Sequence, residues 1–422
     1  MERYSEYKDS GIYYIPLIPS SWNVLKGKIL FKEEKRPIRQ QDEIVTCFRD
    51  GQVTLRKNRR LEGFTNSLKE IGYKGIRKGD LVIHNMDAFA GAIGVSDSDG
   101  KGTPVYAVCT PIREDVNQYY YCFLLRFMAK IGFIQSLAKG IRERSTDFRY
   151  GDFKELLLPV PSRAEQDAIV RYLDAATSKI DKAIAMQQKM IDLLNERKQI
   201  IIQNAVTKGL DENVEMKDSG VEWIGMIPKH WGLYPLRKYL NVNSKRNMPN
   251  AQLLSVTREE GVIVRNTESK EENHNFIPDD LSNYKYVRKG QFVINKMKSW
   301  QGSYGVSNFN GIVSPAYFVY DLNYPNTTYF SMAIRSKMFS PFFSKYSKGI
   351  RIDQWDLVPE ALKIIPFLEP PVEEQIEIVE YLGNLIPKIE SKISNCQRQI
   401  TLLQERKQII INEVVTGKVK VS

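Results

Sequence analysis

The sequence predicts an α/β (α+β) fold, with two mixed α/β domains at opposite ends of an antiparallel two-helix coiled coil and an internal pseudo-twofold repeat. Three observations predict it. The 422 residues contain a long internal repeat, each half contains β-hairpin signals, and each half ends in a segment with a heptad pattern. A period near half the chain length indicates a duplicated domain, because solenoid repeats are only about 20–50 residues long.

The repeat defines the domain boundaries. The string Lys-Asp-Ser-Gly that begins at Lys8 returns at Lys217, and residues 196–202 return letter for letter as residues 405–411, in both cases 209 positions later. We therefore predict four parts, each of ordinary domain or arm size. They are a first globular domain at 1–160, a central helical arm at 161–210, a second globular domain at 211–369 and a C-terminal helical arm at 370–422.

Each globular domain opens with a lead that proline interrupts and that ends in a tryptophan, Trp22 or Trp231. We expect each tryptophan to anchor its lead to the domain body. Short β-branched runs then flank Asp50-Gly51 in the first domain and Glu260-Gly261 in the second, a pattern typical of β-hairpins. Regularly spaced glycines follow, which indicates a twisted and bulged sheet.

The arms show apolar positions in alternating steps of four and three residues, which is the pattern of a coiled-coil seam. The first arm runs from Ser162 to about Val206 without proline or glycine. The predicted seam residues are Leu173, Ile180, Ile184, Ile191 and Leu194 in the first arm and Leu382, Ile389, Ile393, Ile400 and Leu403 in the second.

Connectivity predicts the direction of the arms. The second domain begins just after the first arm and ends just before the second, and the termini of a domain commonly lie close together. We therefore expect the arms to run antiparallel. At about 1.5 Å per residue, an arm of roughly 45 residues is about 65 Å long. Such a spacer would set two readers of duplex DNA about one to two helical turns apart.

Composition narrows the class of protein. Lys and Arg number 61 against 50 Asp and Glu, a formal charge of +11 that suits a polyanionic partner but also fits an ordinary basic protein. The four cysteines form no Cys-x-x-Cys pair, so we predict a reduced, cytoplasmic chain with no metal site. No run approaches eighteen apolar residues, and we therefore expect no membrane span.

We also expect no catalytic activity. The sequence contains no phosphate-binding Gly-x-x-x-x-Gly-Lys-Ser/Thr loop and no Asn/Asp-Pro-Pro-Tyr of the adenine methyltransferases. The three histidines are isolated in sequence, and isolated histidines are usually structural. Glu215-Met216-Lys217 resembles a fragment of a nuclease motif, but such triplets are common in a chain this rich in charge.

Several motifs together closely resemble the DNA-specificity subunits of type I restriction-modification systems. They are the Lys-Asp-Ser-Gly lead ending in Pro-x-x-Trp, the segments 297–302 and 311–317, and arms that begin near Glu165-Gln166 or Glu374-Gln375 and contain Glu-Arg-Lys-Gln-Ile-Ile. The resemblance covers essentially the whole chain in family order. It implies two target recognition domains, each of which reads one half of a split sequence in double-stranded DNA.

The resemblance also implies partners. The helical arms would set the spacer and dock two methyltransferase subunits, and restriction/translocase subunits would join through that methyltransferase core. The chain itself would bind no cofactor, because S-adenosylmethionine belongs to the methyltransferase subunit. Adenine would be flipped out of the stack for methylation by that partner.

Basic and aromatic residues in predicted loops are the candidates for DNA contact, through phosphates or guanine. For the basic runs, a solvated or salt-bridged surface is an equally good explanation, and the tryptophans could belong to the core. The candidates are Arg56, Lys57, Arg59, Arg60, Arg142, Arg144 and Arg149 in the first domain and Lys296, Lys298, Trp300, Arg351 and Trp355 in the second. Because the halves differ most in these regions, we predict a non-palindromic target.

Apolar residues off the seam are candidates for methyltransferase contact, since exposed apolar area marks a partner surface. They are Ile169, Tyr172, Met190, Ile378 and Tyr381. Packing onto the protein's own domains is an alternative for the outermost ones. Two other classes also stay open: a stand-alone methyltransferase or nuclease with an unrecognised site, and a coiled-coil scaffold that binds DNA without site preference.

Overall fold

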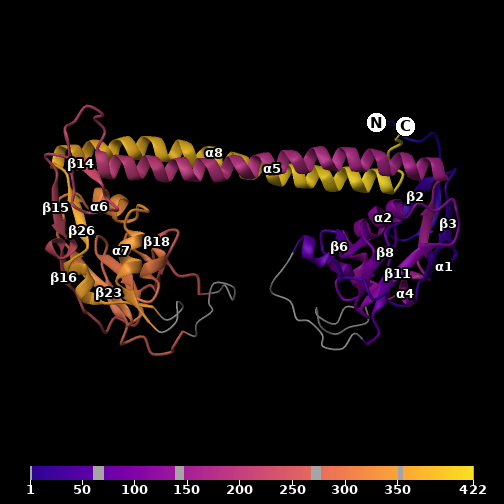
Figure 1. Ribbon diagram of the computed structural model, residues 1–422, viewed down its shortest axis with the longest axis horizontal. Helices are drawn as coiled ribbons and strands as arrows, with labels where there is room; N and C mark the ends of the chain where they lie inside the picture. Colours follow the sequence, from indigo (N-terminus) through magenta and orange to yellow (C-terminus); the bar gives the residue numbers. More distant parts are fainter. Residues whose placement is uncertain (1, 60–70, 138–146, 268–276, 350–354, 422) are drawn as a thin grey trace. The chain divides into compact units, whose positions relative to one another are not determined.

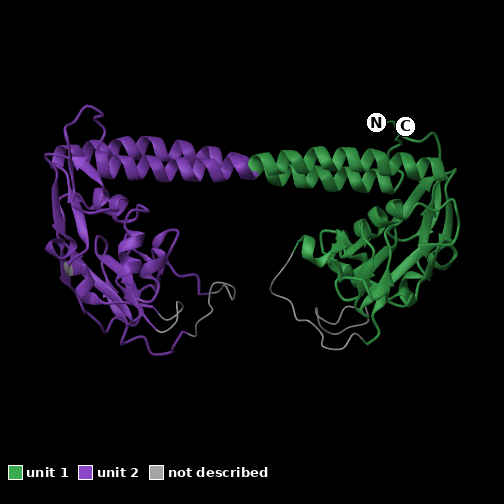
Figure 2. Ribbon diagram, in the orientation of Figure 1, with its two compact units in different colours: residues 1–187, 398–422 green, residues 188–397 purple. Residues whose placement is uncertain are grey.

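The computed structural model describes residues 2–59, 71–137, 147–267, 277–349 and 355–421 (Figure 1). The chain divides into two compact units. Unit 1 contains residues 1–187 and 398–422, and unit 2 contains residues 188–397 (Figure 2). Both units combine antiparallel sheets with helices, which confirms the predicted mixed α/β class.

The centre of unit 1 is a four-stranded antiparallel sheet with the order β4 (Phe31–Glu33), β11 (Tyr106–Pro111), β8 (Leu81–His84) and β9 (Ile93–Val95). Helix α2 (Gln118–Lys130) packs against β8 and β9. It begins where the Asn117 side chain accepts a hydrogen bond from the Tyr119 N–H, because a side-chain oxygen at this position replaces a missing helical partner.

The described part of unit 1 also contains thirteen shorter or peripheral elements besides the sheet, α2 and the arm helices. They are β1 (Tyr7–Ile12), β2 (Ile15–Pro19), β3 (Asn23–Lys26), α1 (Gly27–Leu30), β5 (Val45–Cys47), β6 (Val53–Leu55), η1 (Arg56–Asn58), β7 (Lys74–Ile76), η2 (Ala88–Ala90), β10 (Gly100–Gly102), α3 (Phe133–Leu137), α4 (Tyr150–Phe153) and β12 (Leu157–Val160).

Unit 2 repeats this plan. Its four-stranded sheet has the order β16 (Leu240–Val242), β23 (Tyr317–Leu322), β20 (Phe292–Asn295) and β21 (Tyr304–Val306), which corresponds strand by strand to the sheet of unit 1. Helix α6 (Thr327–Ile334) begins at Asn326, the counterpart of Asn117, and is capped in the same way. The structure therefore confirms the internal repeat that the sequence predicts.

Most other elements of unit 2 have a counterpart in unit 1, but the pair β24 (Ser347–Lys348) and β25 (Asp356–Leu357) and helix η7 (Pro359–Lys363) stand where unit 1 has α4. The remaining elements are β13 (Met216–Asp218), β14 (Met226–Pro228), β15 (Gly232–Pro235), η4 (Leu236–Tyr239), β17 (Leu254–Thr257), β18 (Gly261–Val264), β19 (Lys285–Val287), η5 (Ser299–Gln301), β22 (Gly311–Val313), α7 (Ser340–Lys345) and β26 (Pro366–Glu369).

Both predicted β-hairpins are present. Strand β5 pairs with β6, and β17 pairs with β18. The turns contain Gly51 at φ +88° and Gly261 at φ +78°, a backbone region that residues with a side chain adopt only at a cost. Trp22 and Trp231 are both fully buried, so each lead is anchored as predicted.

Helices α5 (Arg163–Lys208) and α8 (Val372–Val415) contribute to both units. In unit 1 the core contains Ile169 and Leu173 of α5 together with Val414 and Val415 of α8. Farther along both helices, Lys407 Nζ lies 2.6 Å from Asp181 Oδ1. Increasing residue number in α5 therefore matches decreasing number in α8, and the two segments run antiparallel.

The same relation holds in unit 2. Its core contains Val206 at the end of α5 and Ile378 near the start of α8, and Lys198 Nζ lies 2.9 Å from Glu390 Oε1. Lys198 and Lys407 are 209 positions apart, as are Asp181 and Glu390, so one ion pair occurs in both units. Along both helices the predicted seam positions are buried or partly buried, and most of the positions between them are exposed.

The end of α8 and the residues that follow it are held within unit 1 by hydrogen bonds to parts of the chain that are distant in sequence. The Tyr120 hydroxyl donates to the Val415 carbonyl at 3.0 Å, and the Lys420 N–H donates to the Glu2 carbonyl at 2.8 Å. In unit 2 the Tyr329 hydroxyl donates to the Val206 carbonyl at 3.2 Å. Among the described residues, no helix combines the length and the apolarity needed to cross a membrane.

Candidate nucleic-acid interface and partner surface

The basic run predicted to contact DNA in unit 1 follows the β5–β6 hairpin. Lys57 pairs with the Glu43 carboxylate, and Arg59 Nη1 lies 2.6 Å from Asp50 Oδ2. The Arg59 guanidinium also lies 4.3 Å from the centre of the Phe48 ring. Arg56 Nε donates to the Thr46 hydroxyl at 3.2 Å. Ion pairs therefore compensate part of the charge of this run.

Arg60, Arg142, Arg144 and Arg351 lie outside the described residues. The other predicted DNA contacts lie among the described residues.

An arginine that the sequence analysis missed fixes the hairpin turn of unit 2. Arg335, at the end of α6, donates to the carbonyls of Tyr304 at 2.7 Å, Glu259 at 2.6 Å and Arg258 at 2.9 Å. Burial lowers the pKa of Arg335. These bonds hold the turn between β17 and β18 against α6. Arg335 is the counterpart of Arg126 in the internal repeat, and this correspondence was the sequence signal that could have identified Arg335.

The turn that follows strand β8, which we call turn 1 (residues 84–91), is a second candidate element. Its backbone is fixed by hydrogen bonds from the Asp87 N–H to the His84 carbonyl at 3.0 Å and from the Gly91 N–H to the Ala88 carbonyl at 2.9 Å. Gly91 has φ +94°.

The turn that follows strand β20, turn 2 (residues 295–302), has the same backbone in unit 2. The Lys298 N–H donates to the Asn295 carbonyl at 3.0 Å, and the Gly302 N–H donates to the Ser299 carbonyl at 2.9 Å. Gly302 has φ +95°. Both domains therefore present the side chains of this turn on one common main-chain frame.

A cleft of 720 Å³ opens beside turn 1 in unit 1. Two of its basic residues already have partners: Lys74 Nζ lies 2.9 Å from Glu33 Oε1, and Arg149 Nε lies 2.5 Å from Asp147 Oδ2. The cleft is lined by Glu33, Lys74, Asn85, Met86, Pro104, Val105, Ala107, Asp147, Arg149, Tyr150 and Gly151. Of the residues predicted to contact DNA, the structure places Arg149 here.

Turn 2 brings several other predicted residues together in unit 2. Lys296 Nζ lies 2.8 Å from Asp356 Oδ2. The Trp300 and Trp355 rings meet edge to face with centroids 5.5 Å apart, and the Trp300 indole N–H donates to the Met297 carbonyl at 3.2 Å. Both tryptophans are partly buried, and Lys298 is exposed.

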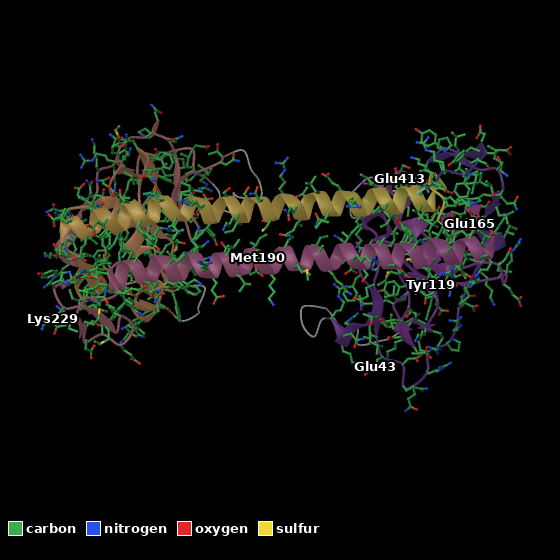
Figure 3. The ribbon with its side chains drawn as sticks, turned by 90° about the horizontal axis from the view of Figure 1, so that it is seen from above. Glu43, Tyr119, Glu165, Met190, Lys229 and Glu413 are labelled. Carbon is green, nitrogen blue, oxygen red and sulfur yellow. The ribbon has the colours of Figure 1, made fainter. Side chains whose placement is uncertain are left out.

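The predicted partner residues on the arms divide into two groups. Ile169 and Ile378 are buried in the cores of unit 1 and unit 2, so the prediction that they contact a partner is wrong, because the protein's own domains cover them. Tyr172 packs partly against the core of unit 1. Met190, labelled on α5 in Figure 3, and Tyr381 on α8 are exposed.

Two exposed apolar pairs on the arms were missed. In unit 2, Leu193 and Ile200 of α5 are 50% and 52% exposed. In unit 1, Leu402 and Ile409 of α8 are 53% and 55% exposed. Members of each pair are seven residues apart and so share one helix face. We call each pair an arm patch. The letter-for-letter repeat of residues 196–202 was the signal that could have identified Ile200 and Ile409.

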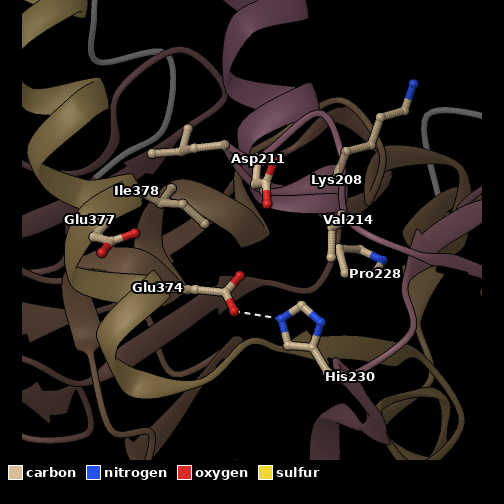
Figure 4. A pocket seen from close by; sticks show the side chains of 10 residues that line it. Lys208, Asp211, Val214, Pro228, His230, Glu374, Glu377 and Ile378 are labelled. Atoms are coloured by element: carbon tan, nitrogen blue, oxygen red, sulfur yellow. Dashed lines mark hydrogen bonds and ion pairs between the residues drawn. The ribbon is translucent and has the colours of Figure 1, made fainter.

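A smaller pocket of 250 Å³ lies in unit 2 between the end of α5 and the start of α8 (Figure 4). His230 Nε2 lies 2.5 Å from Glu374 Oε1, and the Trp231 indole N–H donates to Glu374 Oε2 at 2.9 Å. These contacts fasten the lead of the second domain to α8. Among the described residues, no three His, Cys, Asp or Glu side chains are grouped so that they could hold a metal ion.

Comparison with known proteins agrees with this architecture. The chain is 24% identical to the MjaX type I restriction enzyme specificity subunit of Methanocaldococcus jannaschii, over 94% of this chain and 97% of the relative. It is also 24% identical to the MjaVIII specificity subunit of the same organism, over 74% of this chain and 71% of that relative. The curated relatives are type I specificity subunits. No protein-family model matches the chain.

Solved structures show the fold of these specificity subunits as well. One solved chain comes from a structural study of the complex assembly of a type I system. The match includes 95% of this chain and 99% of the solved chain, with a TM-score of 0.68 and 14% identity. The specificity subunit of Thermoanaerobacter tengcongensis covers 95% and 98%, with a TM-score of 0.50 and 15% identity. Specificity subunits are non-catalytic components of type I systems, in agreement with the prediction that the chain is not an enzyme.

Proposed function

We propose that this chain is the specificity subunit of a type I restriction-modification system, and that it recognises a bipartite, non-palindromic target in double-stranded DNA. The observation that carries the proposal is the pair of turns with one backbone and different side chains. Turn 1 carries Asn85 where turn 2 carries Lys296, and both side chains are partly exposed. Different hydrogen-bonding groups on one frame favour different bases, since base edges differ in their donors and acceptors.

The arm patches support docking of two methyltransferase subunits, one on each patch. Leu193 and Ile200 are the counterparts of Leu402 and Ile409, so equivalent surfaces of the repeat expose the same residues. Apolar side chains that stay half exposed on a helix are typical of a surface that another protein covers. Two copies of one partner fit a surface that occurs twice.

The remaining components would join through those partners. We propose that each methyltransferase subunit binds S-adenosylmethionine and carries out methyl transfer, and that restriction/translocase subunits bind to the methyltransferase core. This chain would contribute target recognition and positioning. Base-modifying enzymes must take the target base out of the duplex, and a rigidly placed reader fixes which base is presented.

Reconstitution tests the proposal. The chain is combined with its methyltransferase subunit, S-adenosylmethionine and genomic DNA, and methylated positions are mapped by sequencing. We expect one motif of two unlike half-sites separated by a fixed spacer, and no methylation when either protein is omitted. Methylation or metal-dependent cleavage by this chain alone would indicate a stand-alone enzyme. DNA binding without any site preference would indicate a non-specific scaffold.

A further inference from the structure

Turn 1 and turn 2 expose a methionine at the same place. Met86 is 47% exposed and Met297 is 43% exposed, and each occupies the third position of its turn. A methionine side chain is flexible and polarizable, so it adapts to irregular apolar surfaces such as the face or methyl group of a base. The same exposed side chain on both turns indicates a contact that both domains make.

The residue before each methionine differs between the domains. Lys296 in turn 2 is engaged with Asp356. Asn85 in turn 1 has its main chain fixed on both sides, because its N–H donates to the Val105 carbonyl at 2.9 Å and its carbonyl accepts from the Phe148 N–H at 3.0 Å. Its side chain is therefore presented from a fixed point on the wall of the cleft.

The side-chain carbonyl oxygen of Asn85 has no hydrogen-bond partner among the described residues. This atom, Oδ1, is buried. A buried carbonyl oxygen without a partner is unfavourable, and a donor group from a ligand would remove that cost. An amide offers one acceptor and two donor hydrogens, which match the N6 amino group and the N7 of adenine.

The charge of the cleft favours a base edge over a phosphate. Lys74 and Arg149 are paired with Glu33 and Asp147, so cations and carboxylates in the cleft balance. Phosphate binding requires uncompensated positive charge, whereas recognition of a neutral base requires directional hydrogen bonds. The apolar part of the wall, which includes Met86 and Val105, suits the flat face of a base.

We infer that Asn85 reads an adenine of the first half-site through its side-chain amide, while Met86 packs against an adjoining base. The inference rests on the proposed function and names a specificity-determining residue within it. Because Lys296 occupies the equivalent position in turn 2, the contact made by Asn85 belongs to the first half-site and not to the second.

The test uses the reconstituted methyltransferase complex and a DNA library in which the first half-site is randomised. Wild type, Asn85→Ala and Asn85→Asp are compared by sequencing of the methylated products. Asn85→Asp has the same shape but no donor hydrogen, so it should accept cytosine, whose N4 amino group donates to a carboxylate. Asn23→Ala, an exposed residue of β3 that does not line the cleft, is the matched control.

We expect both Asn85 variants to lose at least about tenfold of the preference for adenine at one position of the first half-site. The other positions, the second half-site and the control should be unchanged. An unchanged adenine preference in Asn85→Asp, or an equal loss at every position, would overturn the inference. If the wild-type complex methylates without sequence preference, the proposed function itself is wrong, and this outcome is distinct from the other two.

Discussion

The indole N–H of Trp231 donates to Glu374 Oε2 at 2.9 Å, whereas the indole N–H of Trp22, its counterpart in unit 1, is buried without a partner among the described residues. Glu165, the counterpart of Glu374, instead accepts a hydrogen bond from the Tyr4 hydroxyl at 2.5 Å. Both leads are therefore fastened to the start of an arm helix through the same glutamate position, but through different donors.

Replacement of Glu374 tests this anchor. Glu374→Ala should lower the free energy of unfolding of unit 2 by about 1–3 kcal/mol, because it leaves a buried indole N–H without its charged acceptor. Urea denaturation followed by tryptophan fluorescence measures the change. Glu373→Ala is the control, since Glu373 is exposed in the same helical turn and should cost less than about 0.5 kcal/mol.

The arms allow apolar and ionic contributions to be compared within one unit. Ile180→Ala removes a seam side chain that is almost fully buried. We expect the free energy of unfolding to fall by about 2–4 kcal/mol, because apolar burial is lost and a cavity is left behind. Lys407→Ala breaks only the exposed pair with Asp181, which should be worth less than about 1 kcal/mol. Thermal unfolding of both variants under the same conditions shows which substitution destabilises the protein more. A larger effect of Lys407→Ala would contradict a seam that depends on apolar burial.

The arm patches predict the number of bound partners. Leu193→Asp places a charge in one proposed interface and should leave one methyltransferase subunit bound per chain, because an unpaired charge is costly to bury. Leu193→Asp combined with Leu402→Asp should leave none. Native mass spectrometry measures the stoichiometry.

The control for the arm patches is Tyr13→Asp, an exposed residue of the β1–β2 turn in unit 1. This variant should still bind two methyltransferase subunits. Retention of two subunits by the double arm-patch variant would show that the docking surface lies elsewhere.

The cysteines predict a graded reactivity toward a thiol reagent. Burial raises the pKa of Cys47 and Cys109, and it raises the pKa of Cys122 to about 11. At pH 8 these thiols should stay protonated and react slowly in the native protein, since the thiolate is the reactive form. Ellman's reagent should react first with Cys396 on α8, and with all four cysteines after unfolding.

Cys396→Ser is the matched variant for this measurement, and it should remove the fast phase of the reaction. Rapid reaction of three or four thiols in the native protein would mean that the domain cores open readily.

Much of the fold could be predicted because its signals are local or repeated. The heptad spacing through Ile180 and Ile389 predicted the buried seam, and β-branched runs around Gly51 and Gly261 predicted both hairpins. These patterns depend on the 3.6- and 2-residue periods of helix and strand, which act over a few residues. The repeat at 209 positions then extended each local prediction to the other half.

The candidate sites were harder to predict. Ile169 and Ile378 were expected to face a partner, but they pack into the cores, because helical periodicity shows which residues share a face and not what covers that face. Asn85 gave no sequence signal, since its importance comes from an unpaired carbonyl oxygen beside a cleft. The ion pairs of Lys57 and Arg59 were open alternatives that only coordinates could decide.

The sequence by itself determined that the chain is a duplicated α/β protein with two heptad helices, because repetition and periodicity are properties of residue order. It also pointed to the type I specificity subunits, through motifs short enough to be read along the chain. Only the tertiary structure decided which apolar residues stay exposed and which polar atoms stay unpaired. Both properties depend on what distant segments bring against a side chain, and burial and hydrogen bonding are settled by those neighbours.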